Sequence, residues 1–68
     1  MSVTSTWTVT GMTCEHCVAS VTEELEEVAG VESVSVALDS GEVVVTSADE
    51  LARDAVAAAV DEAGYTLV

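Results

Sequence analysis

Two cysteines, Cys14 and Cys17, are the residues whose type and spacing could do chemistry in this chain. They are its only cysteines, and Glu15 and His16 stand between them. Two thiols at this spacing can converge on one soft metal ion or close a small disulfide ring. Two thiolates suit the low coordination of Cu(I) and Hg(II), with Zn(II) as a competitor. A closed zinc site usually takes four protein ligands, and beyond the pair the chain offers one histidine, so no structural zinc site within one chain is expected.

The cysteine pair lies where a strand pattern gives way to a helix pattern. Residues 5–10 alternate between threonines and the pair Trp7 and Val9, which predicts a half-buried strand. From 14 to 29 apolar residues recur at spacings of three and four, which predicts a helix that ends at Gly30. The N–H groups and the dipole at the start of this helix should lower the pKa of both thiols.

The rest of the chain predicts two more strands, a helix and a short last strand. Residues 31–38 and 42–46 alternate and are joined by turn residues, which predicts a hairpin. Ser47 and Glu50 form a capping-box pattern, which predicts a helix running to Gly64, and residues 65–68 form the last strand.

The order of these elements predicts the fold. Strand-helix-strand-strand-helix-strand with right-handed crossovers indicates an α+β, ferredoxin-like βαββαβ sandwich. Its four-stranded antiparallel sheet should have the order 4-1-3-2 and carry two helices on one face. We expect residues 1–68 to form a single domain.

Composition limits the classes of partner. The chain has thirteen acidic residues, one arginine and no lysine, for a formal net charge of −12. Nucleic acid and anionic membrane surfaces need basic patches, so neither is expected as a partner, and the charge favours a monomer in the metal-free state. The longest apolar run, residues 55–60, is too short to span a bilayer, and the first residues lack the features of a signal peptide. We therefore expect a cytoplasmic location without membrane insertion.

The stretch from Gly11 to Cys17, Gly-Met-Thr-Cys-Glu-His-Cys, resembles the heavy-metal-associated (HMA) domain signature Gly-Met-x-Cys-x-x-Cys. The resemblance covers the whole chain, through the helical stripe, the Gly30-Val31 exit, the hairpin and the segment 63–65. Free-standing domains of this size resemble bacterial copper chaperones of the CopZ type. The same domain occurs as N-terminal modules of copper-exporting P-type ATPases and as mercury-binding proteins.

The resemblance implies roles for individual residues. Cys14 and Cys17 would be the metal ligands, and Met12 would pack beneath the loop, with Cu(I) ligation through its thioether as the alternative. Thr13 stands where zinc- and cadmium-directed relatives tend to carry Asp, which favours Cu(I). Tyr65 matches a position near the thiolates, although a core-packing aromatic at the strand edge is an equal alternative.

His16 is weighed from its position alone, between the two cysteines on an exposed first turn. It is either a solvent-facing spacer or a residue that tunes the thiolates, as an imidazolium or as a labile extra ligand.

The function implied is that of a Cu(I) metallochaperone and not of an enzyme. It would pass Cu(I) by ligand exchange to the metal-binding domain of a copper-transporting P-type ATPase, and a copper-responsive regulator is a further partner. Because the chain has no lysine, the partner's docking face should be basic or the contact mostly apolar. Two molecules could also share Cu(I) in a bridged homodimer.

Three alternatives remain open. The chain could be an N-terminal module of such an ATPase, or a domain that binds or buffers Hg(II). A thiol–disulfide oxidoreductase is more remote, because thioredoxins are longer and carry a proline near their cysteines, whereas this chain has no proline.

Overall fold

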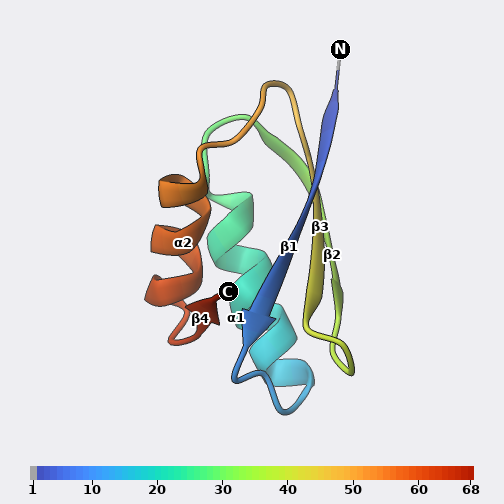
Figure 1. Ribbon diagram of the computed structural model, residues 1–68, viewed down its shortest axis with the longest axis vertical. Helices are drawn as coiled ribbons and strands as arrows, with labels where there is room; N and C mark the ends of the chain where they lie inside the picture. The colour runs from blue at the N-terminus through green and yellow to red at the C-terminus, as the bar shows by residue number, and fades with distance from the viewer. Residues whose placement is uncertain (1) are drawn as a thin grey trace.

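The computed structural model describes residues 2–68 as one sheet with two helices packed on the same face (Figure 1). The elements follow in the order β1 (Val3–Thr10), α1 (Glu15–Glu26), β2 (Val31–Ala37), β3 (Glu42–Ser47), α2 (Arg53–Glu62) and β4 (Thr66–Leu67). The strands lie in the order β2-β3-β1-β4, and every neighbouring pair is antiparallel. The predicted ferredoxin-like sandwich is therefore confirmed, including the strand order.

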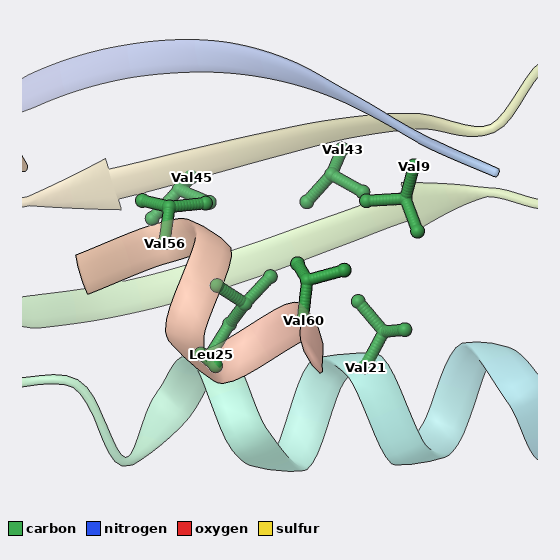
Figure 2. Packing of buried hydrophobic residues seen from close by; sticks show 8 residues of the cluster. Val9, Val21, Leu25, Val43, Val45, Val56 and Val60 are labelled. Carbon is green, nitrogen blue, oxygen red and sulfur yellow. The ribbon is translucent and has the colours of Figure 1, made fainter. Parts of the chain in front are cut away.

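The core lies between the sheet and the two helices, and valine dominates it (Figure 2). Its buried members are Val9, Val21, Leu25, Val43, Val45, Val56, Ala59 and Val60. Stiff, β-branched valines pack well on a pleated sheet, and Leu25 is the largest side chain that is fully buried. Trp7 is half-buried, packs against this cluster and donates its indole N–H to Ser5 Oγ at 2.9 Å. The core is therefore a single small cluster of aliphatic side chains.

The face of the sheet away from the helices, here called the open sheet face, is lined with hydroxyl groups. Thr4, Thr6 and Thr8 of β1 pair with Thr46, Val44 and Glu42 of β3. Ser33 and Ser35 of β2 pair with the same strand on its other side. Because side chains alternate along a strand, the residues between these positions point into the core. One face is thus apolar and the other polar.

The expected start of the second helix is wrong. Ser47 does not cap a helix, because it is the last residue of β3, lies fully buried and pairs with Val3 and Val31. Its hydroxyl donates to the backbone carbonyl of Asp49. The helix begins at Arg53, after an N-cap residue, Ala52, that provides no side-chain cap. The local sequence pattern favoured Ser47 as a helix cap, but its pairing in the sheet makes it part of β3 instead.

The first helix also ends earlier than predicted. It stops at Glu26 with Glu27 as its C-cap, and a turn through Val28 leads to Gly30 at φ +90°. The two helices have 12 and 10 residues. Within residues 2–68, neither is long and apolar enough to cross a bilayer.

Candidate metal centre

The loop between β1 and α1 lies at the lower end of the molecule in Figure 1. Cys14 ends this loop, and Cys17 lies in the first turn of α1. Gly11 turns the backbone out of the strand with φ +96°. A Cβ atom there would lie 3.3 Å from Cδ1 of Tyr65, so the absence of a side chain also lets the tyrosine ring approach the loop closely. The loop thus brings the start of α1 next to a residue more than forty positions away.

The first turn of α1 brings the sulfurs together. Cys14 is the N-cap residue in an extended conformation, and its carbonyl accepts hydrogen bonds from the N–H groups of Cys17 (3.0 Å) and Val18 (3.3 Å). The chain therefore folds back on Cys14, and the two Sγ atoms lie 3.5 Å apart as free thiols. Cys14 is exposed, whereas only 9% of the Cys17 surface remains accessible. The pair has one open sulfur and one sheltered sulfur.

The surroundings of Cys17 stabilise its thiolate. The backbone N–H of Thr13 and then the hydroxyl of Tyr65 are the main causes that lower the pKa of Cys17 to about 6. The N–H and thiol of Cys14 act in the same direction, while burial opposes them. The same contact raises the pKa of Tyr65, since its hydroxyl donates to the sulfur. A lowered thiol pKa was expected, and for Cys17 it is confirmed.

The donors differ from those expected. The sequence pointed to the helix as the source of the N–H groups, but the leading donor belongs to Thr13, in the loop before the N-cap. Successive loop N–H groups that point at one atom form an anion-binding concavity, and this arrangement depends on backbone angles. No residue type in the sequence predicts that the Thr13 N–H would be the leading donor.

The other predicted site residues lie around the pair in different ways. Met12 is half-buried and packs against the core, and the hydroxyl of Thr13 lies 3.8 Å from Cys17 Sγ. His16 is exposed on the first turn of α1, where its backbone carbonyl accepts a bond from Ser20. Across residues 2–68 no three His, Cys, Asp or Glu side chains are grouped to hold a metal ion. The structure therefore offers two sulfurs and brings no histidine or carboxylate to join them.

The hairpin between β2 and β3 packs against the end of β1, the strand that leads into the loop. Gly41, at φ +75°, donates its N–H to Ala37, and its carbonyl accepts the N–H of Val9 at 2.9 Å. A Cβ atom at Gly41 would collide with the backbone carbonyl oxygen of Val9. This turn consequently fits directly against the end of β1, two residues before the metal loop begins. The sequence predicted the turn but gave no sign of this contact.

Comparison with known proteins places this geometry in a family. Residues 6–66 match the model of the heavy-metal-associated domain. The copper chaperone CopZ of Bacillus subtilis (strain 168) is 40% identical over 58 residues, which cover 84% of each chain. A mercuric reductase of Serratia marcescens is 44% identical over 57 residues, but the match takes up only 12% of that enzyme.

Solved structures agree in fold. A CopZ metallochaperone superposes with a TM-score of 0.89 at 33% identity, covering 97% of this chain and all of the other. A copper-binding domain from HMA7, a P-type ATPase, gives a TM-score of 0.87 at 31% identity and covers 100% and 92% of the two chains. The chain belongs to the heavy-metal-associated domain family.

Proposed function

We propose that the protein is a Cu(I) metallochaperone that holds one ion between Cys14 and Cys17. One observation supports this most directly: two free sulfurs lie 3.5 Å apart, and one of them has a pKa of about 6. Two metal–sulfur bonds of roughly 2.3 Å, the length of zinc–thiolate bonds, span up to about 4.6 Å, so one ion can reach both sulfurs with little movement. A thiolate already formed at neutral pH binds metal without first losing a proton.

The same geometry supports transfer by ligand exchange. Two-coordinate Cu(I) accepts a third thiolate, so an incoming partner sulfur can bond to the ion before an original sulfur leaves. Cys14 is exposed and Cys17 is sheltered, so the partner would replace Cys14 first and Cys17 last. Only metal–sulfur bonds and the S–H bonds of the exchanging thiols are made or broken, which fits a carrier and not an enzyme.

We infer that the partner is the metal-binding domain of a copper-transporting P-type ATPase. The support is the match to a copper-binding domain from a P-type ATPase, since a donor and an acceptor of similar fold can present paired cysteines to each other. Exchange of this kind requires reduced thiols, which favours the cytoplasm as its location. We take residues 1–68 to be one domain and retain a copper-responsive regulator and a Cu(I)-bridged dimer as further partners to test.

Competition against a strong Cu(I) chelator tests the site. We expect the wild type to withdraw Cu(I) from the chelator in a 1:1 ratio and the double variant Cys14→Ser/Cys17→Ser to fail. Met12→Leu is the matched control, because it replaces the one other sulfur of the loop by a side chain of similar size. Unchanged binding by the double variant would refute the site, and loss of binding in the control would make Met12 a ligand.

The match to mercuric reductase supports Hg(II) as a second candidate ion. Two-coordinate thiolate binding suits Hg(II) as well as Cu(I). Titration with Hg(II), followed by transfer assays with each ion to an ATPase domain, separates the two functions. Transfer of Hg(II) but not of Cu(I) would replace the proposed function with mercury binding.

A further inference from the structure

The surface charge of this protein is almost entirely of one sign. The chain has thirteen acidic residues, one arginine and no lysine. All thirteen acidic side chains are exposed except that of Glu24, which is half-buried. Net charge far from zero destabilises a compact state through self-repulsion. A chain of this size has few means of offsetting that repulsion.

Several carboxylates lie at the C-terminal ends of the two helices, where negative charge destabilises the helix. The last turns of both helices lack a basic residue and carry acids, at Glu23, Glu26 and Glu27 around the end of α1 and at Asp61 and Glu62 in α2. The C-terminal end of a helix is the negative end of its dipole, so acids there are unfavourable. Residues spaced by three and four are neighbours on the helix surface, so Glu23 also repels Glu26 and Glu27.

The core has little reserve against this repulsion. One leucine, six valines and one alanine make up its buried cluster, and no aromatic side chain is fully buried among the described residues. Domains of this length bury a smaller share of their surface than larger domains do and are correspondingly marginal. Repulsion that a larger protein would tolerate is therefore significant here.

An independent feature of the surface points to the same environment. Concentrated salts can strengthen the burial of apolar surface, so exposed apolar patches would drive association there. Among residues 2–68 the one large apolar side chain that is strongly exposed is Val68, at 63%. The open sheet face presents mainly threonine and serine hydroxyls around the half-buried Val44, in place of a large apolar patch.

We propose that the protein is built to reach full stability in molar monovalent salt. The Debye length falls from about 10 Å at 0.1 M to about 3 Å at 1 M salt. The Cβ atoms of residues three or four apart on a helix are separated by about 5–6 Å, so the carboxylates of such residues repel each other at the first concentration and are largely screened at the second. The charge that disfavours folding in dilute buffer then keeps the protein hydrated and dispersed. The proposal does not depend on the proposed function, because it concerns the metal-free protein.

Urea unfolding of the reduced, metal-free protein tests the proposal at KCl concentrations from 0.1 to 3 M, followed by far-ultraviolet circular dichroism. We expect the urea midpoint to rise steadily into the molar range. A helix-end variant, Glu23→Gln/Glu26→Gln/Glu27→Gln, should be more stable than the wild type in 0.1 M KCl and gain less from added salt. The control, Glu32→Gln/Asp39→Asn/Glu42→Gln, removes the same charge from strands and the hairpin.

Each outcome decides one part of the proposal. A wild-type midpoint that is the same in 0.1 and 3 M KCl would overturn it. Equal salt dependence in the wild type and the helix-end variant would also overturn it, because the salt would then act through apolar burial and not by screening. A low-salt gain that is the same in both variants would overturn the specific contribution of the helix ends. A gain larger in the helix-end variant than in the control supports the proposal in full.

Discussion

Replacing Tyr65 by phenylalanine removes one hydrogen-bond donor from the Cys17 sulfur and keeps the ring beside Gly11. With a pKa of about 6, Cys17 is roughly 90% thiolate at pH 7, whereas an ordinary thiol of pKa 9.0 would be about 1% ionised. The hydroxyl is the second largest cause of this shift, after the Thr13 N–H. In Tyr65→Phe the pKa should therefore rise from about 6 and stay below 9.0.

The consequence at neutral pH is measurable. A rise of one pKa unit lowers the thiolate fraction at pH 7 from about 90% to about half. Ultraviolet absorbance of the thiolate, followed against pH in metal-free protein, reports this fraction. The titration is made in a Cys14→Ser background, so that one sulfur alone contributes, and Tyr65 itself ionises only above its ordinary value, outside the pH range of interest.

Thr13→Ala is the matched control for this experiment. Thr13 acts on Cys17 mainly through its backbone N–H, which alanine retains, so its titration curve should stay close to that of the parent. Superimposable curves for the parent and the Tyr65→Phe variant would show that the hydroxyl does not stabilise the thiolate. A large shift in Thr13→Ala would transfer the effect to the threonine hydroxyl, which lies 3.8 Å from the sulfur.

Three further outcomes follow from the structure. The pKa of Cys17 is lowered in the folded state, so its contribution to stability is full above pH 9 and is lost as the pH falls through about 6. The urea midpoint should therefore decline as the pH is lowered over this range, and Cys17→Ser should flatten the decline. Leu25→Ala should lower the free energy of unfolding by about 3–5 kcal/mol, which is a large part of the roughly 3–10 kcal/mol expected for a chain of this length. In the same urea titration, Val68→Ala should change the free energy of unfolding by less than about 0.5 kcal/mol, because Val68 is exposed. Gly41→Ala should lower the thermal midpoint more than Gly64→Ala, since both have positive φ but only the first places a methyl group against a backbone carbonyl; equal losses would contradict the close contact.

The fold was predictable because its pattern is redundant. The alternation in β1 and the three-and-four spacing in α1 agree with each other and with the order of elements, so the strand order and the presence of both helices followed, although not the ends of the helices. The failures lie where one residue had two possible uses. Ser47 suits both a helix cap and a strand end, and its pairing with Val31 and with Val3, forty-four residues away, decides for the strand.

The candidate metal site was also predictable in part. The cysteines and the lowered thiol pKa follow from residue type and from the position of the motif at the junction of a strand and a helix. The contacts that hold them do not, because they come from backbone groups and from segments distant in sequence. The N–H of Thr13, the missing side chain of Gly11 under Tyr65, and the carbonyl of Gly41 on Val9 all require the folded chain to be seen.

The length of β1 has a practical consequence for joining this domain to other molecules. The strand runs most of the height of the molecule, whose longest extent is 33 Å, and its start at Val3 lies at the opposite end from the loop that leads to α1 (Figure 1). A fluorophore, a surface tether or another domain attached ahead of β1 therefore sits far from the sulfurs.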